Sequence, residues 1–139
     1  MKSPHRAVRL ALGLTTGLAL TLAGAPPASA ATWTLNDIHQ QTCVTSSFGH
    51  PGTYFLAQVT GTWSANITLG LSDLPSGSTV MGGLIGGPGS NSDPTLVNGF
   101  VGVSIAPAPV GTYTAHLVAS DGTVTQTNPI TIYVKDSCP

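Results

Sequence analysis

The stretch VGTYTAHLVASDGTV, residues 110–124, determines how we interpret the rest of the chain. Apolar and polar side chains alternate through it, and one face is made by Tyr113, Ala115, Leu117 and Ala119. A period of two is typical of a β-strand with one buried face. Asp121-Gly122 then favours a tight two-residue hairpin turn, and the run 123–134 predicts the returning strand. The sequence therefore predicts a β-hairpin near its end, with the remaining strands packed around it.

Short β-rich runs separated by Gly and Pro fill the chain before this hairpin. They cover residues 32–35, 43–47, 53–60, 66–71, 78–85 and 96–105. Val101, Val103 and Ile105 are expected to point inward, whereas residues 86–94 show no periodicity and are expected to form a loop. Nothing shows the 3.6-residue period of an amphipathic helix. We therefore predict an all-β sandwich of seven to eight antiparallel strands.

Residues 1–30 have the pattern of a secretory signal peptide. A basic head is followed by an apolar run over 10–23 and by Ala28-Ser29-Ala30, which fits the cleavage pattern of small residues. The apolar run is shorter than the roughly 20 residues that a membrane span needs. We expect cleavage after Ala30, a secreted extracellular protein and a single folded domain at residues 31–139.

The charge of this mature part excludes several kinds of partner. It contains one Lys and five Asp but no Arg or Glu, which gives a net charge of −4 with neutral histidines. Nucleic-acid binding depends on many Lys and Arg contacts to phosphates, and binding to anionic membranes depends on basic clusters. We therefore expect neither nucleic acid nor, after signal cleavage, a membrane as partner.

Two segments carry a resemblance to a known family. Residues 67–80 contain ITLGL, LPSG and Val80, and residues 109–122 contain the strand and turn quoted above. Both are similar to bacterial immunoglobulin-like domains, and Tyr113 stands where that family often places a corner tyrosine. The composition also resembles small secreted proteins of the actinobacterial type, from Gram-positive bacteria, that have no assigned function. The resemblance implies a single immunoglobulin-like β-sandwich, and a fold of this kind does not define a ligand.

Cys43 and Cys138 are the two cysteines of the chain. In a secreted protein they are expected to pair, and the loop so closed covers most of the domain. The chain-entropy model assigns such a loop about 4–5 kcal/mol. Antibody-type domains bridge two inner strands instead, whereas Cys138 is the penultimate residue here.

Candidate catalytic and metal-binding residues are sparse. His39, His50 and His116 are the histidines of the mature part, and a zinc site needs three or four convergent ligands. The sequence leaves open whether these three histidines converge. No G-x-S-x-G elbow is present, and the Asp residues stand in expected turns or near the termini. We expect no enzymatic activity, no metal and no cofactor.

The remaining hypothesis is a non-catalytic binding module. Trp33 and Trp63 are the candidate ligand-binding residues, because an exposed pair of indole rings can stack on sugars; core packing is the alternative for each. Polysaccharide or cell-wall surface is therefore the first expected ligand. The alternative is a structural or inhibitory extracellular protein that uses a loop over residues 86–98 for protein contacts. The sequence does not indicate an oligomeric state.

Overall fold

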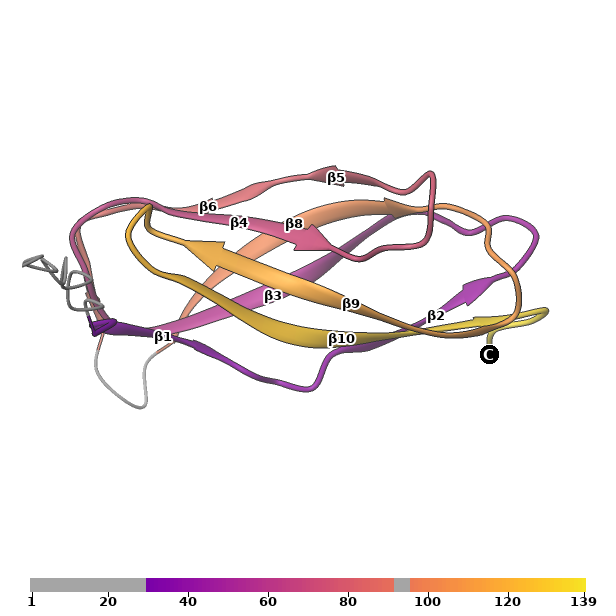
Figure 1. Ribbon diagram of the computed structural model, residues 1–139, viewed down its shortest axis with the longest axis horizontal. Coiled ribbons are helices and arrows are strands. Elements are labelled where there is room, and N and C mark those ends of the chain that lie inside the picture. The colour runs from indigo at the N-terminus through magenta and orange to yellow at the C-terminus, as the bar shows by residue number, and fades with distance from the viewer. Residues whose placement is uncertain (1–29, 92–95) are drawn as a thin grey trace, which may run out of the picture.

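The computed structural model describes residues 30–91 and 96–139, which form ten strands in two stacked sheets (Figure 1). The predicted signal peptide lies outside these residues except for Ala30. Along the long axis, the first strand begins at one end and the C terminus lies at the other (Figure 1). Within the described ranges, no helix is long and apolar enough to cross a membrane.

The first sheet, called sheet A, is antiparallel throughout. Its strand order is β1 (Trp33–Asn36), β3 (His50–Trp63), β8 (Val97–Ile105) and β5 (Thr79–Met81). The short strand β7 (Gly89–Asn91) pairs with the end of β3.

The second sheet, called sheet B, contains the hairpin predicted from the sequence. Its order is β2 (Gln41–Thr45), β10 (Thr125–Lys135), β9 (Gly111–Ser120), β4 (Ile67–Ser72) and β6 (Gly83–Ile85). One pair departs from the predicted antiparallel arrangement, because β2 runs parallel to β10. The reason is that residues 37–40 carry the chain from the edge of sheet A to the edge of sheet B without reversing it.

The core lies between the sheets and is entirely apolar. Alternate residues of the long strands face it, so the inward orientation predicted for Val101, Val103 and Ile105 is confirmed, and Ala115, Leu117 and Ala119 lie opposite on β9. No polar or charged residue is buried in the part of the chain that the structure describes. Burial of apolar surface therefore supplies the main stabilisation, at about 25 cal/mol per Å².

Two predicted segments differ from the observed strands. The run 78–85 is split into β5 in sheet A and β6 in sheet B, and the switch occurs at Gly82. The segment crosses β8 closely, since a Cβ on Gly83 would clash with the Phe100 carbonyl. Within the predicted loop 86–94, residues 89–91 form β7 and pair with β3 instead of being irregular, and residues 92–94 lie outside the described residues.

The hairpin loop is also longer than predicted. Ser120 pairs with Thr125, which leaves four residues, 121–124, between the strands instead of two. Asp121 shapes this loop: its Oδ1 accepts hydrogen bonds from the backbone N–H groups of Thr123 and Val124, at 2.9 and 2.8 Å. A short polar side chain that binds the backbone two and three residues ahead is a common turn-forming device.

Two predicted local features are confirmed. Cys43 on β2 and Cys138 after β10 form a disulfide, with their Cα atoms 5.7 Å apart. The Tyr113 hydroxyl donates a 2.9 Å hydrogen bond to the Pro109 carbonyl four residues upstream, which is the geometry of a tyrosine corner. Both features fasten the ends of β9 and β10 to neighbouring chain.

Candidate functional site

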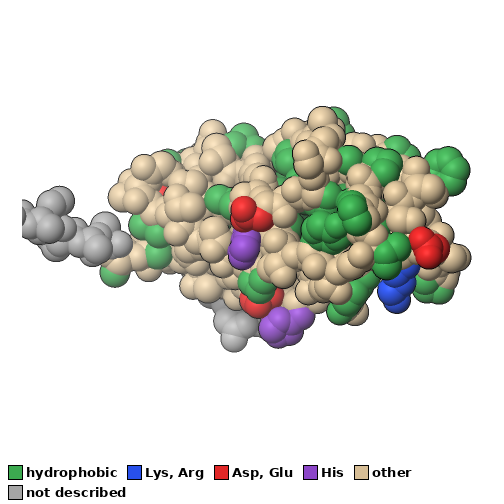
Figure 2. Space-filling view, turned by 45° about the vertical axis from the view of Figure 1, so that its right-hand side comes forward, with side chains coloured by type: hydrophobic (Ala, Val, Ile, Leu, Met, Phe, Trp, Pro, Cys, Tyr) green, Lys and Arg blue, Asp and Glu red, His purple; other side chains and the backbone are tan. Residues whose placement is uncertain are grey.

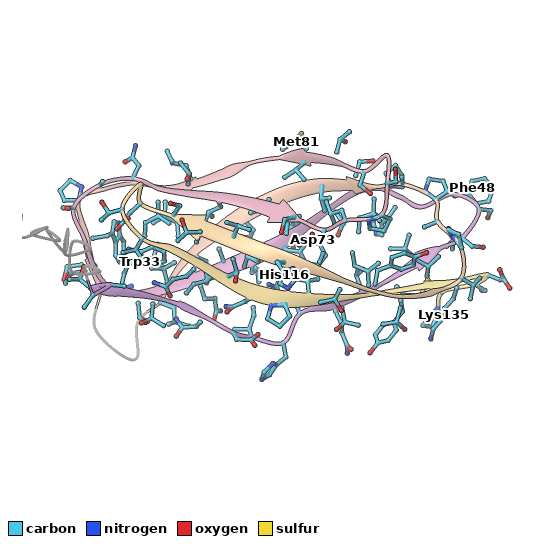
Figure 3. The ribbon with its side chains drawn as sticks, viewed as in Figure 1. Trp33, Phe48, Asp73, Met81, His116 and Lys135 are labelled. Atoms are coloured by element: carbon cyan, nitrogen blue, oxygen red, sulfur yellow. A yellow bond between two sulfur atoms is a disulfide. The ribbon has the colours of Figure 1, made fainter. Side chains whose placement is uncertain are left out.

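The two tryptophans do not form the expected exposed platform. Trp33 and Trp63 are only 2% and 5% exposed, so both rings belong to the core (Figure 3 labels Trp33). Each indole N–H is satisfied there at 2.8 Å: Trp33 Nε1 donates to Asp121 Oδ2, and Trp63 Nε1 donates to the Gly86 carbonyl. The prediction of a sugar-stacking tryptophan pair is therefore wrong, and the alternative of core packing holds for both residues. The physical reason is that β1 and the end of β3 need large side chains to close this end of the sandwich.

An edge of Trp63 does reach a shallow surface depression. The depression has a volume of about 360 Å³ and is lined by Thr32, Thr62, Trp63, Ser64 and Pro88. Because so little of the indole is exposed, it offers no ring face for stacking. The depression thus has hydroxyl groups but lacks an aromatic anchor.

The three histidines do not share a site. His39 is exposed beside Asp37, His50 begins β3, and His116 lies on β9. Among residues 30–91 and 96–139, no group of three His, Cys, Asp or Glu side chains is arranged to hold a metal ion. The question that the sequence left open is answered for these residues: they do not converge.

His116 instead joins an exposed pair with Asp73. Its Nδ1 lies 2.9 Å from Asp73 Oδ2, and Figure 3 shows the two labelled side chains close together. The Ser72 hydroxyl donates to the same carboxylate oxygen at 2.8 Å. Hydrogen bonds lower the pKa of Asp73, and the Ser72 hydroxyl has a larger effect than His116. The serine points to the carboxylate and not to the imidazole, so this trio lacks the nucleophile–base contact of a hydrolase.

The outer face of sheet A is the most distinctive surface. Its residues alternate with the buried ones along each strand: Thr34 and Asn36 of β1, Tyr54, Leu56, Gln58 and Thr60 of β3, Asn98, Phe100, Gly102 and Ser104 of β8, and Thr79 and Met81 of β5. None of these side chains carries a charge at neutral pH. We call this surface the sheet A face.

Exposed apolar side chains stand on the sheet A face from β3 to the edge strand β5. Tyr54, Phe100 and Met81 are 61%, 55% and 71% exposed. The rings of Tyr54 and Phe100 meet edge to face, with centroids 5.5 Å apart and planes inclined by 71°. Met81 lies opposite Gly102, which in turn lies opposite Tyr54. The surface therefore contains two aromatic rings and a thioether around a glycine.

Our interpretation of the sequence missed these residues, although the alternation contained the signal. Once Phe55 and Val101 are assigned to the core, their neighbours Tyr54 and Phe100 must point outward. The sequence could not show that β3 and β8 are adjacent, and this pairing is what brings the two rings together.

The outer face of sheet B has a different character. It carries the Asp73–His116 pair, and Lys135 Nζ lies 5.6 Å from the centre of the Tyr133 ring. Figure 2 shows a face of the molecule on which charged side chains are few. The two outer surfaces of the sandwich therefore differ in charge as well as in aromatic content.

These two sheets and their strand order define an immunoglobulin-like β-sandwich. Over residues 34–136 the chain matches the model of DUF5980, a family of unknown function, and it belongs to that family. No curated protein matches the sequence.

Solved structures with a similar fold share little sequence with this chain. A chimeric titin Z1Z2 chain, functionalized with an exogenous peptide from decorin, is 17% identical with a TM-score of 0.43. That match covers 77% of this chain, which spans 50% of the titin chain. The ASH/PapD-like domain of human CEP192 is 13% identical with a TM-score of 0.34, and the match covers 96% of this chain and 99% of that one.

Proposed function

We propose that this protein is a secreted, non-catalytic module that binds a neutral polysaccharide through the sheet A face. The observation that supports it is the composition of that face: an exposed Tyr54–Phe100 pair surrounded by amides and hydroxyls, without a charged group. The resemblance to bacterial immunoglobulin-like domains and the disulfide of an oxidising compartment agree with an extracellular role. Cell-wall or environmental polysaccharide would then be the source of the ligand.

The polar residues of the face complement the rings. Gln58 and Asn98 lie opposite each other on β3 and β8, and Asn36 lies opposite Gln58 on β1. A side-chain amide offers two donors and two acceptor lone pairs, which suits the hydroxyl groups of a sugar. An aromatic ring supplies apolar contact area for the C–H side of the same sugar. A neutral ligand also avoids burying an unpaired charge against this uncharged surface.

The size of the face favours such a ligand over a stable protein partner. The strands β3 and β8 contribute about seven residues each and the edge strands β1 and β5 contribute four and three, which at about 3.4 Å per residue and 4.8 Å between strands gives a surface of roughly 350 Å². Stable protein–protein interfaces bury about 800 Å² on each partner. The face therefore reaches about half of that area, whereas a polysaccharide chain can be held by a narrower strip.

One observation favours protein–protein contact as the second candidate. Phe48 is 80% exposed at the tip of the turn between β2 and β3, at the same end as Lys135 (Figure 3). The turn is held by hydrogen bonds from Gly49 N to the Thr45 carbonyl and from Ser46 N to the Lys135 carbonyl, at 2.9 and 2.8 Å. A rigid turn that presents an aromatic side chain could enter an apolar pocket of an extracellular protein.

Depletion from solution tests the lead proposal. The purified, disulfide-intact protein is incubated with neutral polysaccharides (cellulose, chitin, starch and a mixed β-glucan), and the protein left in the supernatant is measured. We expect binding to at least one polysaccharide, reduced at least tenfold in Phe100→Ser. Tyr133→Ser, which removes an exposed aromatic from the opposite sheet, is the matched control and should bind like the wild type. Binding to none of the panel, or undiminished binding by Phe100→Ser, would refute the proposal.

A further inference from the structure

We infer that the sheet A face takes a single, flexible polysaccharide chain and not the flat surface of a crystalline polysaccharide. This inference rests on the proposed function and specifies the physical form of the ligand. It follows from the mutual orientation of the Tyr54 and Phe100 rings and from the absence of a side chain at Gly102.

The orientation of the rings argues against a flat ligand. Because the planes of Tyr54 and Phe100 are inclined by 71°, at most one of the two rings can lie parallel to any flat surface. A crystalline surface would therefore stack on one ring and touch only the edge of the other. A single chain can turn between successive sugars, so that it contacts the faces of both rings.

Gly102 leaves a slot in the face. Tyr54, Gly102 and Met81 stand in one row across β3, β8 and β5. The Cα atoms of the two outer residues are separated by two strand spacings, about 10 Å, and the Met81 side chain lies over the glycine backbone between them. Once the Met81 side chain moves aside, this width suits one chain and not a sheet of chains.

The walls of the slot suit a chain that runs along β8. Tyr54 stands on one side and Met81 on the other, while Phe100 precedes Gly102 by two residues on β8. At the opposite end, Ser104 and its partner Thr79 contribute hydroxyl groups. A Cβ placed on Gly102 would lie 3.0 Å from the terminal methyl of Met81, so this side chain leans over the floor of the slot. A methionine is flexible enough to move aside for a ligand.

The test compares two physical forms of the same polysaccharide. Cellohexaose and chitin hexamer are titrated by calorimetry, and microcrystalline cellulose and crystalline chitin are used in depletion assays. We expect one of the hexamers to bind, and the corresponding crystal to retain at least tenfold less protein at the same concentration of sugar.

Two substitutions locate the binding in the slot. Gly102→Val fills the floor while leaving both aromatic rings, and it should weaken hexamer binding at least tenfold. Gly70→Val is the matched control, because Gly70 lies in β4 of the other sheet and a Cβ there meets nothing within 4 Å. Thermal melts of both variants check that each is folded; if Gly102→Val is not, Gly102→Ala replaces it.

The outcomes separate the inference from the proposed function. If a crystalline polysaccharide retains the protein and neither hexamer binds, or if both forms bind with equal affinity, the inference of a single-chain ligand is refuted. Polysaccharide binding itself then still holds. If a folded Gly102→Val variant binds the hexamer as strongly as the wild type does, the slot is not the binding site. Binding to neither form, together with failure of the wider panel, would refute polysaccharide binding itself and direct attention to Phe48 and a protein partner.

Discussion

Removal of the disulfide should destabilise the protein strongly. The bond joins Cys43 and Cys138, which are separated by 95 positions, so the loop that it closes includes nearly all of the strands. The chain-entropy model gives about 4.7 kcal/mol for a loop of this size at 25 °C. Stabilities of single domains are about 5–15 kcal/mol, so this loss is a large fraction of the total.

The native contacts near the bond should survive its removal. β2 and β10 are paired through five residue pairs beside the disulfide, and Val44 of β2 is buried in the core. We therefore expect the Cys43→Ala/Cys138→Ala variant to retain its β-sheet circular dichroism while becoming less stable. At about 4 °C per kcal/mol, its melting temperature should fall by roughly 15–20 °C.

Urea unfolding of the wild type and of the double variant measures this effect. The free energy of unfolding should fall by about 4–5 kcal/mol, and the dependence on urea should steepen because the unfolded chain expands. Reduction of the wild type with a thiol is the control and should produce the same stability as the double variant. A loss below about 1 kcal/mol in both cases would show that the unfolded chain stays compact without the bond, and the entropic argument would be wrong.

Three further predictions concern the turns. Hydrogen bonds lower the pKa of Asp121. The largest effect comes from the backbone N–H of Val124, followed by the Trp33 indole and the Thr123 N–H. The stability that Asp121 contributes is therefore present above its unfolded value of about 3.9 and lost as the pH falls through the lower folded value. Asp121→Asn should cost about 1 kcal/mol at pH 7 in urea melts and progressively less as the pH falls through the folded value, and a cost that does not change with pH would contradict this. Gly49→Ala should abolish soluble expression, since Gly49 has φ +67° and a Cβ would clash with the Ile105 carbonyl; a folded variant would refute it. Tyr113→Phe should lower the free energy of unfolding by about 1 kcal/mol, and an unchanged thermal melt would show that the corner hydrogen bond contributes nothing.

Local patterns in the sequence were sufficient for the fold class. Alternation over residues 111–120 placed Ala115 and Leu117 on one face of a half-buried strand, and in the structure this face is buried in the core. The disulfide followed from a count of two cysteines. Information of this kind is short-range or depends on composition, so it can be obtained without knowing which strands are neighbours.

The features that could not be predicted depend on long-range packing. Nothing in residues 78–85 shows that the chain changes sheets at Gly82, because this depends on how closely β6 approaches β8. Trp33 is buried in a core built from distant strands, and its indole N–H donates to Asp121, 88 residues away. The Tyr54–Phe100 pair forms only because β3 and β8 are adjacent. Each of the site predictions that failed required a contact between distant parts of the chain.

The position of Tyr54 and Phe100 is itself an argument for binding. The core beneath them is complete without their rings, since Phe55 and Val101 face inward from the neighbouring positions. An aromatic cross-strand pair on a solvated face adds only about 0.2–1 kcal/mol, and a pair of threonines would add a similar amount. Exposed aromatic rings also increase the risk of association, which proteins usually reduce with charged residues. The sheet A face has the rings but none of these charges, which is the combination expected if its apolar surface is covered by a neutral ligand when the protein functions.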